Sequence, residues 1–326
     1  MATYQGIKGR TVQNLASDPP AALGLGQVWY NTTGGTLKTS VAVGAWASGT
    51  TLPTPGARYN VPGFGILTAG ALVGGYGGTP TRTSETTEYD GTTWTVGGAM
   101  VQQASDNAAN GPLTGAFTAG GYTGSPTNTS GTYDGTSWTA QGTISGGPQF
   151  PQNQSAGTAT AGLIFGGPNA GNTTTEEFDG ATWTTVNNLP ANRGAGAGGG
   201  TQTDAFGIAG GYPTIQTAGV LYDGTSWTAG NSCNTARNRG GGSAGGGTAA
   251  SPVGFFCGGN VPAATGAAEE FDGTSWASMP SLATARASNG VFGTKTAGVC
   301  AGGSPTPSNV EEFILADTVQ TITSTT

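Results

Sequence analysis

The chain has 326 residues, a formal net charge of −7 and charged residues at only 8% of its positions. Its ten Lys and Arg residues form no basic cluster, so nucleic acid is not an expected partner. No apolar run is long enough to cross a bilayer, and the first residues lack the apolar core of a secretory signal, so we expect neither membrane association nor export.

The absence of His narrows the expected chemistry further. It removes the commonest general base and the commonest metal ligand, and with them a Ser-His-Asp triad or a His-ligated zinc or copper site. We therefore expect no catalytic residue, no metal site and no cofactor. The three Cys cannot form an even-numbered disulfide framework, and we expect them to be buried as small apolar residues.

Residues 1–40 lie outside the periodic pattern that follows them. Within them, two β-prone runs flank the turn Asn-Thr-Thr-Gly-Gly at 31–35, which predicts a small hairpin over 27–38. The stretch before this hairpin is extended and polar, so we expect residues 1–40 to form an arm that anchors the protein to a partner. The apolar side chains that would contact this partner are Tyr4, Ile7, Val12, Leu15 and Leu23.

From residue 41 onward, two landmarks alternate with a period of about 46 residues. The first is a Gly pair, found at 74–75, 120–121, 166–167, 210–211, 258–259 and 302–303. The second is an aromatic residue followed by Asp-Gly and then by Trp, found as Tyr89/Trp94, Tyr133/Trp138, Phe178/Trp183, Tyr222/Trp227 and Phe271/Trp276. A period in the mid-forties with short strands and turn signals is typical of a β-propeller.

Each repeat predicts one four-stranded antiparallel blade. In the fourth repeat, residues 195–200 form a small-residue inner strand, residues 204–211 a second strand and residues 217–222 a third. Asp223-Gly224 then favours a two-residue hairpin, because both residue types tolerate positive φ, and Trp227 lies on the fourth strand. Inner strands are small because blades converge toward the axis, and the aromatic side chains fill the wider space outside.

The repeat resembles that of the kelch β-propellers over residues 47–314. The matching features are the Gly pair, the third-strand aromatic, the fourth-strand Trp and an Arg before the next first strand, present as Arg58, Arg193, Arg237 and Arg286. The resemblance implies a binding scaffold, since enzymes are a minority of such propellers. We thus predict an all-β, six-bladed kelch-like propeller over residues 41–326, with a short N-terminal extension and its hairpin.

Six Gly pairs but only five aromatic–Trp units leave the last blade without its fourth strand. Trp46 lies 48 residues before Trp94, which is one repeat, so residues 41–47 can supply that strand and join the two ends of the chain. The competing candidate is the alternating tail at residues 318–323. We favour the segment of Trp46, and both alternatives give six blades.

Two further sets of residues recur in the repeats. In four repeats a Glu precedes the third-strand aromatic, and we expect its carboxylate to pair with a recurring Arg or with backbone N–H groups. These residues are Glu88, Glu177, Glu270 and Glu312. The loops after the Gly pairs begin with Tyr, which either stacks on a sugar or packs at the blade edge. The candidate ligand face consists of Tyr76, Tyr122 and Tyr212.

The segment Gly26–Lys38, next to a Thr- and Gly-rich kelch array, resembles structural proteins of bacteriophages, especially marine ones. The resemblance implies a non-enzymatic virion protein of the tail, fibre or capsid, made in the host cytoplasm. Other virion proteins would be its partners in a multi-copy assembly. A carbohydrate-binding propeller for a host surface glycan is the alternative. A propeller enzyme is less expected, because copper oxidases of this fold use His ligands and sialidases use an Arg cluster at the axis.

Overall fold

The computed structural model describes residues 12–19, 27–53, 57–77, 81–145, 153–167, 172–211, 214–243 and 253–323. The chain forms two compact units. The terminal unit comprises Met1–Ala45 and Ile314–Thr326, and the sheet unit comprises Trp46–Phe313. The sequence groups the last residues with the repeats, whereas their contacts group them with the N-terminal segment.

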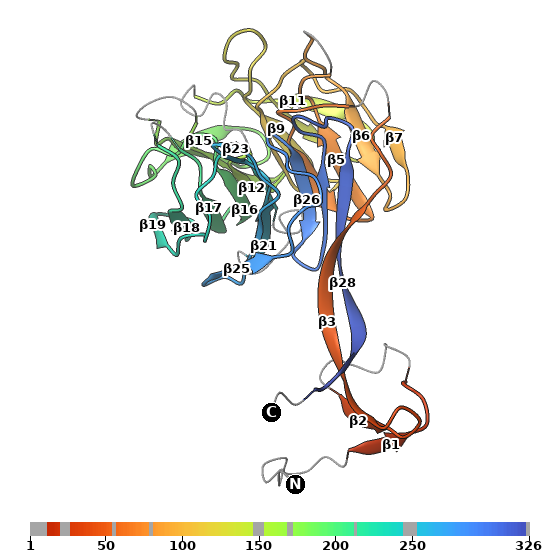
Figure 1. Cartoon of the computed structure of the whole chain (residues 1–326). Coiled ribbons are helices and arrows are strands. Elements are labelled where there is room, and N and C mark those ends of the chain that lie inside the picture. Colours follow the sequence, from red (N-terminus) through yellow and green to blue (C-terminus); the bar gives the residue numbers. More distant parts are fainter. Residues whose placement is uncertain are drawn as a thin grey trace. The chain divides into compact units, whose positions relative to one another are not determined.

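The sheet unit is built from repeated small antiparallel sheets, which follow one another along the chain (Figure 1). Sheet I contains β4 (Gly63–Ile66), β5 (Ala69–Val73), β6 (Thr86–Tyr89) and β7 (Trp94–Val96). Sheet II contains β8 (Ala108–Asn110), β9 (Ala116–Ala119), β10 (Ser130–Tyr133) and β11 (Trp138–Gln141). Sheet III contains β12 (Ser155–Thr158), β13 (Ala161–Phe165), β14 (Thr175–Phe178) and β15 (Trp183–Val186).

The remaining sheets repeat this order. Sheet IV contains β16 (Ala197–Thr201), β17 (Asp204–Ile208), β18 (Gly219–Tyr222) and β19 (Trp227–Gly230). Sheet V contains β20 (Gly241–Ser243), β21 (Gly254–Cys257), β24 (Ala268–Phe271) and β25 (Trp276–Met279), and a small ribbon of β22 (Asn260–Val261) and β23 (Ala263–Ala264) lies between β21 and β24 in the chain. The larger sheet VI has the order β1-β2-β3-β28-β27-β26, with β26 at Gly290–Thr294, β27 at Ala297–Ala301 and β28 at Val310–Thr321.

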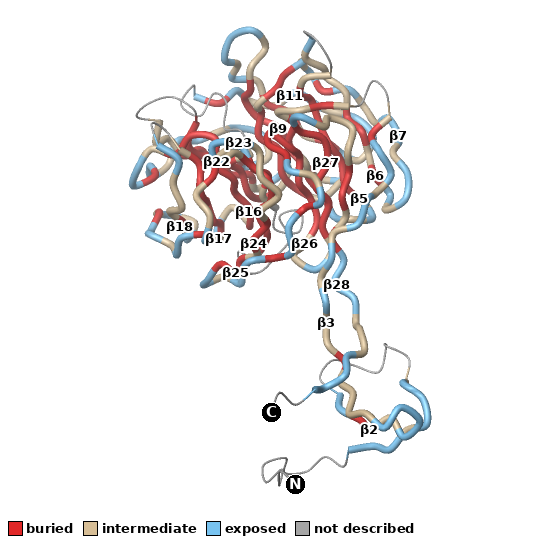
Figure 2. Tube along the Cα trace, viewed as in Figure 1, coloured by how far each residue is buried: buried red, intermediate tan, exposed pale blue. Residues whose placement is uncertain are grey.

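The described chain is therefore all-β, without a helix, and propeller-like, as the repeat predicts. Burial falls across each sheet, because the first strands carry small residues that pack closely. In sheet IV, for example, β16 (Ala-Gly-Gly-Gly-Thr) is almost wholly buried, whereas two of the four residues of β19 are exposed. Figure 2 shows the buried residues concentrated on strands such as β9 and β27.

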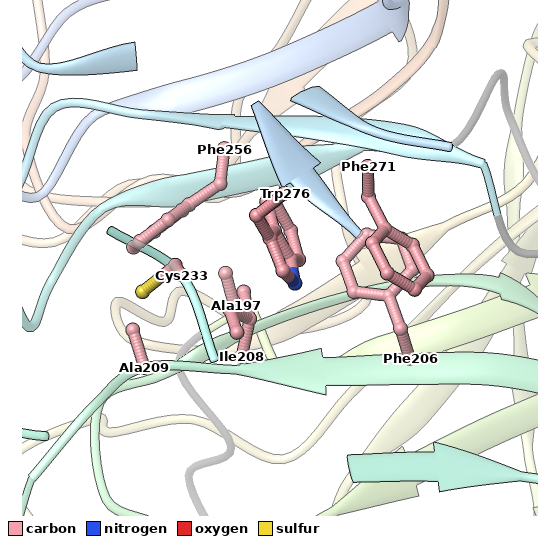
Figure 3. Close-up of a cluster of buried hydrophobic side chains, with 8 residues drawn as sticks. All are labelled: Ala197, Phe206, Ile208, Ala209, Cys233, Phe256, Phe271 and Trp276. Atoms are coloured by element: carbon pink, nitrogen blue, oxygen red, sulfur yellow. The ribbon is translucent and has the colours of Figure 1, made fainter. Parts of the chain in front are cut away.

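Among the described residues of the sheet unit, the core is divided into six apolar clusters, and each lies between two sheets. Five of them join sheets that follow each other in the chain, and the sixth joins sheet VI to sheet I through Phe292 and Tyr89. Figure 3 shows the cluster between sheets IV and V, where Phe206 of β17 lies beside Phe271 and Trp276. The ring centroids of Phe206 and Trp276 are 5.6 Å apart at 80°, an edge-to-face contact that aromatic quadrupoles favour.

The Asp-Gly turns differ from the two-residue hairpin that the sequence predicts. Tyr222 pairs with Trp227, which leaves a four-residue loop in which only Gly224 has positive φ. The Asp223 carboxylate accepts hydrogen bonds from the backbone N–H of Thr225 (2.9 Å) and Ser226 (2.7 Å), and these bonds lower its pKa. The side chain closes the longer loop, so a tight turn is not needed. The same arrangement recurs at Asp90, Asp134, Asp179 and Asp272.

The fourth Gly pair is also placed wrongly by the sequence pattern. In sheet IV the two left-handed residues that follow the second strand are Ala209 (φ +56°) and Gly210 (φ +84°), one position before the visible Gly210-Gly211 pair. In the other sheets both residues are Gly, as at Gly74 and Gly75. Ala rarely adopts this conformation, so the residue types do not show that Ala209 and Gly210 are the equivalents of the Gly pairs in the other sheets, whereas the backbone does.

The fourth strand of sheet VI comes from the N-terminal side, as favoured above. The end of β3 (Thr36–Ser48) lies next to β28, and the rings of Trp46 and Phe313 are 5.3 Å apart. The corresponding aromatic and Trp in sheet IV, Tyr222 and Trp227, are 4.9 Å apart. Residues 318–321 are instead a continuation of β28.

The terminal unit contains the predicted hairpin, formed by β2 (Val28–Asn31) and the start of β3, and β1 (Gln13–Leu15) adds to β2 in parallel. Trp29 is buried, and its indole N–H donates to the Asp18 carboxylate at 3.1 Å. The Asn31 amide donates to the same carboxylate at 2.7 Å, and the two bonds lower the pKa of Asp18. These contacts hold the strand of Asn31 against the segment that precedes it.

Candidate functional site

Six non-glycine residues with left-handed backbone mark one end of the sheet unit. Each lies two or three positions before the first strand of its sheet, and their φ angles fall between 51° and 71°. They are Asn60, Asp106, Asn153, Ala195, Arg239 and Ser288, one from each of sheets I to VI. The sequence pattern does not reveal them: Asn and Asp tolerate positive φ, but Ala, Arg and Ser give no such signal.

Backbone hydrogen bonds connect these residues from sheet to sheet. The N–H of Asp106 donates to the carbonyl of Asn60 (3.0 Å), and the N–H of Asn60 donates to Ser288 (2.8 Å). Ser288 in turn donates to Arg239 (2.6 Å), and Arg239 to Ala195 (2.8 Å). Five equivalent residues, far apart in sequence, are therefore held side by side by their main chains.

A polar cleft opens at these residues. Its volume is about 340 Å³, and its lining includes Tyr59, Asn60, Arg239 and Ser288. A smaller pocket shares the last three residues and adds Asp106 and Asn153. Ala264, Ala287 and Pro305 also line the cleft, so it presents several polar groups beside a smaller apolar surface, which suits a ligand with many polar groups.

Beside the cleft lies a stack of three tyrosines and one Arg. The Arg82 guanidinium lies 4.6 Å from the ring centre of Tyr76 and 4.5 Å from that of Tyr122, and it also donates a hydrogen bond to the Tyr76 hydroxyl. Tyr59 stacks on Tyr76 at 5.1 Å with an interplanar angle of 9°. Cation–π contact and stacking fix these rings at the border of the cleft.

The stack is connected to Asp106 by hydrogen bonds. Arg82 Nε donates to the Ser105 hydroxyl at 3.3 Å, and this hydroxyl donates to the Asp106 carboxylate at 2.8 Å. Of the predicted ligand-face tyrosines, Tyr76 and Tyr122 are thus half-buried and lie next to the cleft, while Tyr212 lies outside the described residues. Sequence reasoning missed Arg82 and Tyr59, which no repeat position marks.

Two of the predicted anchor residues are described. Val12 is exposed, and Leu15 is half-buried at the end of β1. Tyr4, Ile7 and Leu23 lie outside the described residues.

The recurring Arg residues serve the sheets rather than a common pocket. Arg193 Nη1 donates to the backbone carbonyls of Ala209 (2.7 Å) and Ala218 (2.5 Å). Arg58 makes the equivalent bonds to Gly74 and Glu85. Burial lowers the pKa of both Arg58 and Arg193 to about 10.

Two of these Arg residues form buried ion pairs. Arg237 lies 2.6 Å from Glu269, and Arg286 lies 2.5 Å from Glu311. The Glu269 carboxylate also accepts from the backbone N–H of Asn234 and Thr235, so three hydrogen bonds satisfy it, whereas Arg237 Nε is buried without a partner among the described residues. Such additional hydrogen bonds offset part of the cost of burying an ion pair.

The pairing with Arg or backbone N–H groups that the sequence predicts for Glu88, Glu177, Glu270 and Glu312 is wrong. Glu88, Glu177 and Glu312 accept hydrogen bonds from tyrosine hydroxyls of a neighbouring sheet: Tyr133, Tyr222 and Tyr89, respectively. The fourth, Glu270, lies 3.9 Å from Lys295. The carboxylates that meet Arg stand one position earlier and point to the opposite face, because side chains alternate along a strand.

The cysteines are free and buried, as predicted. Burial raises the pKa of Cys233 to about 11. Among the described residues, no three Asp, Glu or Cys side chains gather in a way that could hold a metal ion. The same residues include no helix of the length and apolarity that a membrane crossing requires.

In comparisons with known proteins, no family model and no curated protein matches the chain. The assignment of a function therefore depends on the geometry described above.

Proposed function

We propose that sheets I to VI form one closed, six-bladed propeller of the kelch type, and that it acts as a binding scaffold without enzymatic activity. Two observations support closure. The sixth apolar cluster joins sheet VI to sheet I. The N–H of Gly303 in sheet VI also donates to the Arg58 carbonyl before sheet I (2.8 Å), just as Gly210 donates to Arg237 between sheets IV and V (2.9 Å). The Gly pairs, the aromatic–Trp pairs and the buried Arg support the kelch assignment.

We further propose that this scaffold is a structural protein of a bacteriophage particle, located in the tail, fibre or capsid and made in the host cytoplasm. The observation that carries this proposal is the surface of the terminal unit. Seven of the twelve large apolar side chains that are exposed in the described chain belong to it. They are Val12, Val28, Tyr30, Val43, Ile314, Leu315 and Ile322. Concentrated exposed apolar side chains are typical of assembly surfaces.

Deleting residues 1–26 tests the anchor. The deletion removes β1 and all five predicted contact residues, and it leaves β2, β3 and Trp46 in place. We expect a truncated protein that still melts cooperatively but no longer co-sediments with particles from the host cells that produce it. The matched control is a full-length chain in which Ile215 and Val261, exposed apolar residues of the sheet unit, are replaced by Ser. Normal assembly of the truncated protein would place attachment on the propeller or on residues 318–326.

A further inference from the structure

We propose that the polar cleft at the left-handed residues binds a sugar. The site deepens the scaffold proposal, and it rests on closure of the six sheets into one ring. Tyr59, Asn60, Arg239 and Ser288 line the cleft, and Asp106 lines the smaller pocket that shares Asn60, Arg239 and Ser288 with it.

The hydrogen-bonding groups of the cleft fit a ligand with several hydroxyls. A sugar hydroxyl both donates and accepts, so its site needs groups of both kinds. The Asp106 carboxylate only accepts, the Arg239 guanidinium only donates, and the Asn60 amide and Ser288 hydroxyl do both. Of the described residues, none forms a hydrogen bond with the side chain of Asn60, Arg239 or Ser288, so these groups are available to a ligand.

The two charges lie on opposite sides of the proposed ring. Asp106 belongs to sheet II and Arg239 to sheet V, three places apart in a cycle of six. Asn60 of sheet I and Ser288 of sheet VI lie between them along the chain of backbone hydrogen bonds. A pyranose placed over the ring would thus meet an acceptor on one edge, a donor on the other and neutral groups between.

The cleft has the size and the aromatic wall that such a ligand requires. Its volume of about 340 Å³ falls at the lower end of the range for small-molecule pockets, which suits one or two sugar rings. Tyr59 lines it and is fixed by its stacking on Tyr76, so it offers a rigid surface for the C–H face of a sugar.

The backbone at this site points to function as well. A left-handed conformation at Ala, Arg or Ser costs on the order of 1–2 kcal/mol per residue. The chain keeps it at Ala195, Arg239 and Ser288, where Gly would be free of this cost. Strained residues of this kind cluster at ligand sites, because the strain aims side chains that a relaxed backbone would turn elsewhere.

The experiment titrates the full-length protein with free glucose, galactose, mannose, N-acetylglucosamine and glucuronate, observed by saturation-transfer NMR and calorimetry. We expect at least one of them to bind in the millimolar range. Asp106→Asn and Arg239→Asn should each weaken binding about tenfold, because each removes one charge-assisted hydrogen bond. Asn is chosen since it tolerates positive φ and already stands in the ring at Asn60 and Asn153. A uronate should lose more affinity than a neutral sugar in Arg239→Asn.

Matched controls are Asp204→Asn and Lys295→Asn, which remove the same charges away from the cleft and should leave affinity unchanged. Absence of sugar binding in a protein that melts cooperatively overturns the site, as does equal affinity in Asp106→Asn, Arg239→Asn and the controls. Binding of an acidic peptide in place of every sugar also overturns it. These results would leave particle attachment, which is measured separately by co-sedimentation, unaffected.

Discussion

The junction between sheets I and II and the junction between sheets IV and V contain the same backbone hydrogen bond. They differ in side chains, because the first has small uncharged residues where the second has a buried ion pair. Gly75 donates to the Ala104 carbonyl at 2.8 Å, and Gly210 donates to the Arg237 carbonyl at 2.9 Å. In sheet V the Arg237 side chain is paired with Glu269, whereas in sheet II the same two positions are Ala104 and Gly131. The left-handed Gly therefore makes the link between sheets, and the side chains fill the remaining volume.

The junction between sheets I and II, which has the small residues, is not completely filled. A pocket about the size of one water molecule lies next to Ala104, Gly120 and Ser130 in sheet II. In sheets I and IV, Arg58 and Arg193 fill the equivalent space and bond the strand carbonyls. Across the sheets, this position is therefore occupied by an Arg in an ion pair with Glu, by an Arg bonded to backbone carbonyls, or by Ala.

The largest effect should follow from breaking the ion pair on one side only. Arg237→Met leaves the Glu269 carboxylate buried without its cation, and we expect a loss of about 3–5 kcal/mol in the free energy of unfolding, measured by denaturant titration. The double variant Arg237→Met/Glu269→Val copies the apolar Val220 of sheet IV and should recover most of the loss. A double variant as unstable as the single one would show that the charges themselves hold the junction.

Sheets II and V have the same packing of an aromatic ring against the Trp of the fourth strand, and substitution of these Trp residues tests this packing. Trp138 stacks on Tyr133 at 4.9 Å, as Trp276 does on Phe271 at 4.9 Å. Trp138→Ala also removes an indole hydrogen bond to Thr86 of sheet I (2.8 Å), and we expect it to cost about 3 kcal/mol. Trp276→Ala is the matched variant and should cost a similar amount. Thermal melts that shift by less than a few degrees would contradict the assigned packing.

A smaller effect is expected at the Tyr–Glu contact between sheets I and II. Tyr133→Phe leaves Glu88 without its hydroxyl donor, so stability should fall by about 1–2 kcal/mol. The next junction already contains the apolar version, with Thr132 in place of the Glu and Phe178 in place of the Tyr. Glu88→Thr/Tyr133→Phe should therefore be close to the wild type. A double-mutant cycle without coupling would show that the contact contributes nothing.

Much of this architecture could be predicted from the sequence, because its signals are local and repeated. The period of the Gly pairs predicts the sheets, and Trp46 predicts the last strand of sheet VI from its distance to Trp94. The Ala209-Gly210 position could not be predicted, since positive φ at Ala leaves no trace in the residue type. The partners of Glu88 were missed because they come from the next sheet, 45 residues away.

The cleft was missed for a related reason. Its residues share a backbone conformation and not a residue type, so Asn60, Asp106, Arg239 and Ser288 look unrelated until the sheets are aligned. The predicted tyrosines were closer to the site, because two of them border it through Arg82. The Tyr residues of the loops predicted the region next to the cleft, but the left-handed backbone was needed to identify the residues that line it.

The smallest effect should appear at alkaline pH and depend on which junctions contain Tyr. Burial is the largest cause that raises the pKa of Tyr89, Tyr133 and Tyr222, and the hydrogen bond of each hydroxyl to a Glu is the next. Burial also raises the pKa of Cys233 to about 11. In the unfolded chain these groups lose their protons at pH values near 9 to 10, whereas the folded protein retains them. The folded state thus binds more protons, and stability must fall as pH rises above about 9. Melting temperatures between pH 8 and 11 measure this decline.

Glu88→Thr/Tyr133→Phe removes one titrating Tyr without leaving a carboxylate unpaired, so its melting temperature should fall less steeply with rising pH. An identical slope in both proteins would mean that Tyr133 ionises equally easily in the folded and unfolded states.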